Sequence, residues 1–308
     1  MARRKRGQPV HGWVIVDKPS GVSSAQAVAT VRRVFDAAKA GHAGTLDPLA
    51  TGVLPVALGE ATKTVPYVMD ATKDYDFTIQ WGEARSTDDR EGAVTATSDV
   101  RPDETAIREA TRRFVGEIEQ VPPIYSAVKV DGERAYDLAR SGEEVDLEPR
   151  RIEILAFDLA EIIDTDRARF RVSSGKGAYM RALARDLAES LGTVGHIVAL
   201  RRLRVGPFAE AEAISLDSLG ELMHNPAAFE HLRPVATALD GIPALALSGP
   251  EAKTLRNGQG VPVFRAMDRD RFGHLREGDL VYALEGDIPV AIARIEGGAI
   301  RPVRVLNL

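Results

Sequence analysis

The chain has 308 residues, of which 44% are hydrophobic and 28% charged, and its formal net charge is −5 at pH 7. A chain of this length can bury a full core and form two domains. It contains no cysteine, which excludes disulfides, Cys-ligated zinc, iron–sulfur clusters and thiol catalysis. It also lacks a run of roughly 18 apolar residues for a membrane span. Because the basic start, Arg3 to Arg6, leads into Gly7 rather than an apolar signal-peptide core, we expect a cytoplasmic protein.

The charges are unevenly distributed along the chain. Basic residues outnumber acids between Arg150 and Arg204, whereas residues 83–109 are rich in acids. The negative total disfavours a protein that coats nucleic acid indiscriminately, since phosphate contacts come from Lys and Arg. A polarised surface is compatible with one RNA-binding face, but the solvated faces of an amphipathic fold would give the same pattern.

The first predicted elements are a strand at residues 13–17 and a helix that begins with a capping box of Ser23 and Gln26. We predict that this helix ends before Gly41, a residue suited to a left-handed stop. Its apolar face is formed by Val28, Val31, Val34, Phe35 and Ala38.

Strand and helix signals then mix without a strict βαβ alternation. We predict helices at residues 104–114 and 178–191. Strand character is found at residues 75–81, 93–97, 126–130, 151–163 and 167–173. This order predicts an α+β fold with a largely antiparallel, mixed sheet.

From Gly241 the pattern changes to a short helix at residues 250–257 followed by compact strands. These strands are expected at residues 280–284, 289–295 and 300–306. We therefore expect a first domain at residues 1–240 and a small β-rich domain at 241–308. The intervening stretch 203–245 is either a linker or an additional helical connection.

The most unusual segment is the glycine-rich loop at residues 41–52, GHAGTLDPLATG, which holds His42 and Asp47. Asp47 followed by Pro48 is also typical of a helix N-cap with proline at the first helical position. His42 could simply form a local hydrogen bond. The loop lacks the glycine spacing of phosphate-binding motifs. The residues alone leave both a structural and a functional interpretation open.

This loop closely resembles the catalytic loop of the TruB family of tRNA pseudouridine-55 synthases. Three further stretches match the same family in the same order: residues 16–24 (VDKPSGVSS), 120–129 (QVPPIYSAVK) and 174–181 (SGKGAYMR). The resemblance spans roughly residues 11–205. It implies the pseudouridine synthase catalytic fold, a divergent PUA-like RNA-binding domain at the C-terminal end, and isomerisation of a uridine in the T loop of tRNA without a metal or other cofactor.

By this resemblance Asp47 is the catalytic carboxylate. A carboxylate buried under a stacked base tends to become protonated, so it needs a cationic partner to stay ionised. The family places that partner at Arg181, and we predict an Arg181–Asp47 ion pair. Tyr75 matches the tyrosine that stacks on the uracil and is implicated in removing the C5 proton, and Tyr179 matches a second aromatic wall.

The resemblance also assigns roles around this centre. His42 matches a histidine that wedges into the loop vacated by the uridine, and Leu200 matches an apolar pocket lid. Lys18 matches scaffolding for the catalytic loop. Asp89 aligns with an acid of the family and is expected among the substrate- and RNA-binding residues. Ser86 stands where Asp is common and inherits no role. Residues 126–151, with Lys129, resemble an RNA-gripping insertion that we expect to order on binding.

The expected partner is the T stem-loop of tRNA, bound by a monomer that needs no other protein. Two alternatives remain. The chain could act on another RNA, as guide-RNA-dependent relatives do, or it could be a tRNA-folding protein with a vestigial site. A sugar-acting hydrolase is a third reading, but the sequence offers no clear second carboxylate at a recognisable spacing.

Overall fold

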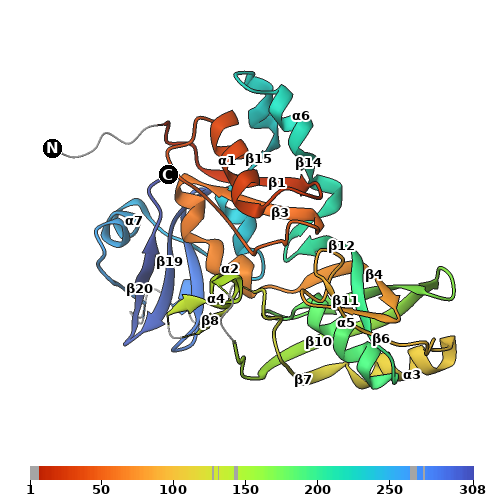
Figure 1. Cartoon of the computed structure of the whole chain (residues 1–308). Coiled ribbons are helices and arrows are strands. Elements are labelled where there is room, and N and C mark those ends of the chain that lie inside the picture. Colours follow the sequence, from red (N-terminus) through yellow and green to blue (C-terminus); the bar gives the residue numbers. More distant parts are fainter. Residues whose placement is uncertain (1–6, 127, 131, 142–144, 264–268, 273–274) are drawn as a thin grey trace.

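The computed structural model describes residues 7–126, 128–130, 132–141, 145–263, 269–272 and 275–308. It contains a large mixed sheet with helices packed on it and a separate small sheet formed by the C-terminal part of the chain (Figure 1). Within these residues no helix is long and apolar enough to cross a membrane.

The large sheet has the main strand order β14-β1-β3-β12-β4-β11-β10-β7. Only the β1–β14 and β3–β12 pairs among its described neighbours are parallel. The predicted largely antiparallel sheet is therefore confirmed. Its strands are β1 (Gly12–Lys18), β3 (Thr51–Leu58), β4 (Lys73–Trp81), β7 (Gly116–Gln120), β10 (Arg150–Ile162), β11 (Arg167–Ser174), β12 (Gly195–Val205) and β14 (Ile214–Ser215), with β2 (Ala40–His42), β13 (Phe208–Ala209) and β15 (Leu232–Arg233) paired beside them.

The predicted helices are present as α1 (Ser24–Val34), α3 (Glu104–Arg113) and α5 (Met180–Ser190). The capping box of Ser23 and Gln26 opens α1 as predicted. The predicted end at Gly41 is wrong, because α1 ends at Val34 and the left-handed residue after it is Asp36 (φ 44°). Gly41 instead lies in β2.

Helix α5 is fixed to the sheet by its apolar face. Leu183 and Leu187 are fully buried, and each contributes roughly 1.5–3 kcal/mol relative to an exposed side chain. Because the residue at its start is Tyr179, this packing also fixes where the last of the four motifs meets the sheet.

Strands β3 and β12 are central and were not predicted. The segment TGVLPVAL of β3 is almost entirely buried, which is typical of a strand covered on both faces. Gly52 has φ +97°, and a Cβ atom there would lie 2.2 Å from the carbonyl oxygen of Arg202. The two strands therefore approach each other at the end of the 41–52 loop.

The stretch 203–245 extends the large sheet before the chain enters the small one. It forms β14, which pairs parallel with β1, and β15, which pairs antiparallel with the same strand. Helix α6 (Leu216–Glu221) lies between them and packs on α1.

The small sheet has the order β16-β18-β19-β20-β17 and a hydrophobic core of its own, as expected for a β-rich second part. Its elements are β16 (Ala244–Ala246), α7 (Gly249–Arg256), β17 (Val261–Pro262), α8 (Arg269–Phe272), β18 (Leu280–Glu285), β19 (Ile288–Glu296) and β20 (Ala299–Val305). The chain then returns to the first body. Leu306 is buried in a cluster with Trp13 and Phe208, and the amide of Asn307 donates to Glu60 at 2.8 Å.

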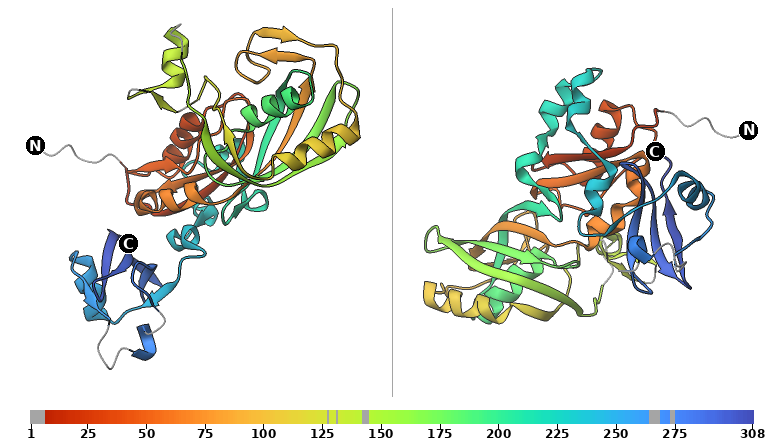
Figure 2. Two further views of the ribbon diagram at one scale, coloured as in Figure 1. Left: turned by 90° about the horizontal axis from the view of Figure 1, so that it is seen from below. Right: turned by 180° about the vertical axis from the view of Figure 1, so that it is seen from behind.

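The insertion projects from the large sheet (Figure 2). It contains β8 (Lys129–Val130), β9 (Glu133–Arg134) and α4 (Ala135–Ser141). Val128, Ala135 and Leu147 form a small cluster that packs against Tyr179. Ordering of this insertion on RNA binding stays a prediction.

A helix and a hairpin flank β4 along the chain. Helix α2 (Val65–Asp70) leads into β4, and the hairpin of β5 (Glu83–Arg85) and β6 (Val94–Thr97) follows β4.

Candidate active site

The loop with Asp47 joins β2 to β3 and contains no helix. The interpretation of Asp47 as a helix N-cap is therefore wrong. The β1–α1 turn supports the loop instead: Lys18 Nζ donates to the carbonyl oxygens of Val22 at 2.7 Å, Pro19 at 2.9 Å and Pro48 at 3.3 Å. Lys18 is fully buried, and burial lowers its pKa to about 8. Its position fits the scaffolding role and is incompatible with direct RNA contact.

Arg202 holds the other side of the loop from β12. Its Nε donates to the carbonyl oxygen of Val53 at 2.8 Å, and Nη2 donates to that of Gly44 at 3.0 Å. Burial lowers the pKa of this guanidinium, whereas Tyr75 and Asp47 oppose that shift. Arg202 stands beside Tyr75 in the β12–β4 register, so a fixed cation lies next to the phenol.

The predicted Arg181–Asp47 ion pair is confirmed. Arg181 Nε donates to Asp47 Oδ2 at 2.8 Å. The side chain of Arg181 is only 5% exposed, whereas that of Asp47 is 34% exposed. The carboxylate therefore faces solvent while its cationic partner is held inside.

Two backbone carbonyls and a second acid fix Arg181. Its Nη1 donates to Thr87 and its Nη2 to Tyr125, each at 2.8 Å. Asp89 Oδ2 lies 3.7 Å from Nε, and Thr87 Oγ1 donates to Asp89 Oδ1 at 2.5 Å. Asp89 was placed with the RNA-binding residues, but it is buried and does not line the pocket. Its carboxylate is instead occupied with Arg181.

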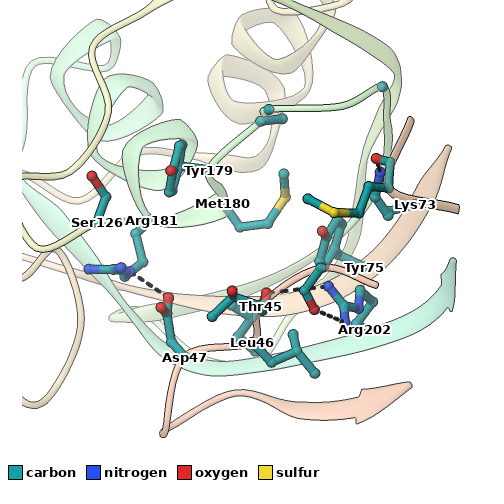
Figure 3. A pocket seen from close by; sticks show the side chains of 16 residues that line it. Thr45, Leu46, Asp47, Lys73, Tyr75, Ser126, Tyr179, Met180, Arg181 and Arg202 are labelled. Carbon is teal, nitrogen blue, oxygen red and sulfur yellow. Dashed lines mark hydrogen bonds and ion pairs between the residues drawn. The ribbon is translucent and has the colours of Figure 1, made fainter. Parts of the chain in front are cut away.

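A pocket of about 290 Å³ opens in front of this pair. Asp47 and Arg181 stand at one end, and Tyr75, Lys73 and Arg202 stand at the other (Figure 3). The pocket is lined by Gly44, Thr45, Leu46, Asp47, Met69, Lys73, Tyr75, Ser126, Gly175, Gly177, Ala178, Tyr179, Met180, Arg181, Leu200 and Arg202. Its size is near the lower end for small-molecule sites, which suits one nucleoside.

Tyr75, Tyr179 and Leu200 all line this pocket as expected. Tyr179 precedes α5, and its amide donates to Gln120 Oε1 at 2.9 Å while Gln120 Nε2 donates back to its carbonyl at 3.2 Å. Burial raises the pKa of the Tyr179 hydroxyl. The motifs at 120–129 and 174–181 thus meet through one amide side chain.

His42 and Lys129 lie elsewhere. His42 is on β2, does not line the pocket, and has a buried Nδ1 without a partner. Burial, followed by the nearby Arg202, lowers its pKa, so the imidazole is neutral at pH 7. Lys129 lies on β8 of the insertion, and its side chain is outside the described part of the structure.

Sequence reasoning missed Arg202 and Lys73 as parts of the site. Lys73 Nζ donates to the carbonyl oxygens of Met69 and Ala71, both at 2.5 Å, at the C-terminal end of α2. Burial lowers the pKa of Lys73 to about 8. A signal for Arg202 would have required the prediction of strand β12, because adjacent residues of a strand point to opposite faces and one of Arg201 and Arg202 then has to face inward.

The site offers one ionisable acid to a bound molecule. Among the described lining residues, Asp47 is the only carboxylate, which argues against a glycosidase that needs two. In the described part of the chain no group of three or more His, Asp or Glu side chains could hold a metal ion. A carboxylate with a fixed cation, opposite a tyrosine beside a second cation, can act on a flat ring and the sugar attached to it.

The fold and this site define the class of pseudouridylate synthases. The TruB family pseudouridylate synthase model (N-terminal domain) matches residues 32–180, and the tRNA pseudouridylate synthase B C-terminal domain model matches residues 181–240. The chain therefore belongs to the TruB family, as the resemblance implied.

Full-length relatives support the same family assignment. The chain is 56% identical to tRNA pseudouridine synthase B of Rhodospirillum rubrum and 50% identical to that of Caulobacter vibrioides, over 100% of each chain. Among solved structures, a Cbf5-Nop10-Gar1 complex contains a chain 26% identical, with a TM-score of 0.73 over 96% of this chain and 84% of that one. A chain of an H/ACA RNP bound to substrate RNA is 23% identical, with a TM-score of 0.75 over 100% of this chain and 92% of that one, and it shows the shared fold alone.

Proposed function

We propose that this chain isomerises uridine 55 in the T loop of tRNA to pseudouridine, with Asp47 as the catalytic carboxylate. The observation that carries the proposal is the Arg181–Asp47 ion pair at one end of a nucleoside-sized pocket that has Tyr75 at the other end. Full-length relatives named tRNA pseudouridine synthase B support tRNA as the substrate.

The reaction moves bonds without changing composition. The N1–C1′ bond of uridine breaks, the uracil turns, and C5 bonds to C1′; C5 then loses its proton and N1 gains one. Asp47 has a role in each of three routes: addition to C1′, addition to uracil C6, or assistance of an elimination to a glycal. All three need a carboxylate beside the bound nucleoside, and Arg181 holds that of Asp47 in place at 2.8 Å.

Tyr75 is proposed to stack on the uracil and to take part in removing the C5 proton. The guanidinium of Arg202 beside it stabilises negative charge on the phenolic oxygen. Tyr179 and Leu200, which line the same pocket, would close over the base. This arrangement suits a nucleotide extruded from its stack.

The remaining assignments concern the RNA. The neutral ring of His42 could fill the space that the extruded uridine leaves, because an uncharged imidazole stacks readily between bases. Residues 126–151, with Lys129, and the PUA-like domain at 241–308 would grip the stem-loop beside the catalytic domain at 1–240. We propose that the enzyme acts as a monomer, and its tRNA substrate would place the activity in the cytoplasm.

The test uses a T-arm stem-loop that carries tritium at C5 of uridine 55. Purified protein should release tritium stoichiometrically, whereas Asp47→Asn should release none and bind the RNA with similar affinity. A matched stem-loop with its tritium on another uridine should release nothing. Equal release by Asp47→Asn would remove Asp47 from its assigned role.

The same assay separates the alternatives. Activity on the bare stem-loop, with no other protein or RNA, excludes dependence on a guide RNA. Tight binding with no release from either the stem-loop or whole tRNA would instead favour an RNA-binding protein with a vestigial site.

A further inference from the structure

Two arginines one turn apart on α5 bridge the same pair of chain segments. Arg181 reaches the carbonyl oxygens of Thr87 and Tyr125, each at 2.8 Å. Arg185 Nη1 donates to Asp88 at 3.0 Å, and its Nη2 donates to the carbonyl oxygen of Val121 at 2.9 Å. The second arginine thus repeats the bridge of the first, four residues further along the helix.

Asp88 and Arg185 take no direct part in the pocket, since neither lines it. Both are mostly buried, with side chains 17% and 24% exposed, respectively. Asp88 lies between the two residues that hold Arg181, namely Thr87, which offers its carbonyl, and Asp89, which offers its carboxylate. Any shift of Asp88 therefore moves both supports of Arg181.

The backbone at Asp88 is held in an unusual conformation by its own segment and by β12. Its φ is +56°, a left-handed conformation that costs an L-residue energy unless the surroundings hold it. Its amide donates to Arg85 at 3.0 Å and its carbonyl accepts from Ile197 at 3.1 Å. The Arg185 contact is thus a second side-chain link, besides the contacts of Arg181, between this turn and α5.

We propose that Asp88 and Arg185 are positioning residues, an inference that rests on the proposed function. Their ion pair holds the turn at residues 87–89 against α5 and so keeps Arg181 directed at Asp47. The family resemblance assigns no role to either residue. Catalysis would then depend on an ion pair that does not contact the substrate.

Because Asp88 is titratable, the ion pair between Asp88 and Arg185 depends on pH. Burial raises the pKa of Asp88 to about 6, against the opposing pull of Arg185 and Arg181. The charged and titratable groups around it are Arg181, Arg185 and Asp186 on α5, Asp89 on its own segment, and His196 beside Ile197 on β12. Below about pH 6 Asp88 becomes neutral and its ion pair with Arg185 weakens.

The test compares wild type with Asp88→Asn, because Asn tolerates a left-handed φ and resembles the protonated carboxyl. At pH 7.5 the variant should have a kcat lower by about tenfold, with KM within about twofold, since a small misplacement of a catalytic group affects chemistry more than binding. The ratio of the two kcat values should approach one at pH 5. In this ratio of kcat values, the effects of all other groups that titrate in both proteins cancel.

Two further variants complete the design. Arg185→Lys keeps the charge but cannot form both contacts of the guanidinium, so it should show a similar kcat loss. Asp164→Asn removes the acid from an exposed pair with Arg167 in the β10–β11 turn and should leave kcat unchanged at every pH. Circular dichroism and Tm check that all variants fold.

Each result has one meaning. If wild type forms no pseudouridine, the proposed function fails. If wild type is active and Asp88→Asn equals it, or differs by a ratio that is the same at pH 5 and pH 7.5, the positioning role of Asp88 is wrong. A ratio that converges at low pH supports it.

Discussion

The hydroxyl of Ser24 donates to the carbonyl oxygen of Leu46 at 2.9 Å and accepts from the amide of the same residue at 2.8 Å. One buried side chain thus satisfies both backbone groups of the residue before Asp47. Because Ser24 is the first residue of α1, the start of that helix determines where the carboxylate stands. This contact explains why the motif at residues 16–24 accompanies the loop at 41–52.

Ser24→Ala should therefore weaken both stability and catalysis. Two buried backbone groups lose their partner, which costs about 1–3 kcal/mol, and the freed loop should lower kcat by about tenfold without weakening RNA binding. Urea unfolding and tritium release measure the two effects. Ser190→Ala, at an exposed serine of α5 that bonds only within its helix, is the control. An unchanged kcat in Ser24→Ala would mean that Lys18 and Arg202 alone hold the loop.

Gly52→Ala should be far more harmful than Gly21→Ala. Both glycines have a left-handed φ, +97° and +82° respectively, but only at Gly52 would the new Cβ meet another strand, 2.2 Å from the carbonyl oxygen of Arg202. At Gly21 nothing lies within 4 Å, so its cost is the conformational strain of about 1–2 kcal/mol. We expect Gly52→Ala to lose about 4 kcal/mol or more, measured by urea unfolding. Equal losses would show that the β3–β12 approach adjusts freely.

The elements that the sequence predicted are those with a local signal. The capping box of Ser23 and Gln26 and the alternation in β10 and β11 depend on neighbouring residues alone. The start of α1 and the bounds of both strands were predicted within one or two residues. Strand β3 escaped prediction because it directly follows a glycine-rich loop and is buried along nearly its whole length, so it has no alternation. The end of α1 before Asp36 was not predicted, because an Asp in the left-handed conformation is rarer than a Gly in that conformation.

The site was predictable where a motif carried it. Asp47, Arg181, Tyr75, Tyr179 and Leu200 come together as the resemblance implied. The contacts of Arg202 and the contact of Asp89 with Arg181 were not predicted, because they join segments far apart in sequence. Lys73 was missed although its two contacts are local. Arg202 bonds to residues about 150 positions earlier in the chain, and no local pattern reports such a contact.

The buried Lys73 should make stability depend on pH in the alkaline range. Its pKa is about 8 in the folded protein and 10.5 when unperturbed, so between these values the unfolded chain holds a proton that the folded protein has released. Stability then rises with pH, and the unfolding free energy of wild type should rise relative to Lys73→Met from pH 8 to pH 10. Lys18 is present in both proteins, so its contribution to the pH dependence cancels in the difference.

Urea unfolding at several pH values measures this difference, with Lys253→Met on the exposed side of α7 as the control. The control difference should stay flat. A Lys73→Met difference that is equally flat would show that Lys73 keeps its proton when folded.

The last residues of the chain should anchor the small sheet to the large body. Leu306 is 1% exposed and packs with Trp13 and Phe208, so Leu306→Ala leaves a cavity that should cost about 2–5 kcal/mol. Leu308, at 46% exposure, is the matched control, and Leu308→Ala should change stability by less than about 0.5 kcal/mol. Limited proteolysis should cut Leu306→Ala between the two bodies, near residues 241–248, faster than wild type. Equal cleavage would mean that the contacts of Lys63 and Glu60 with residues 305 and 307 suffice to hold the small sheet in place.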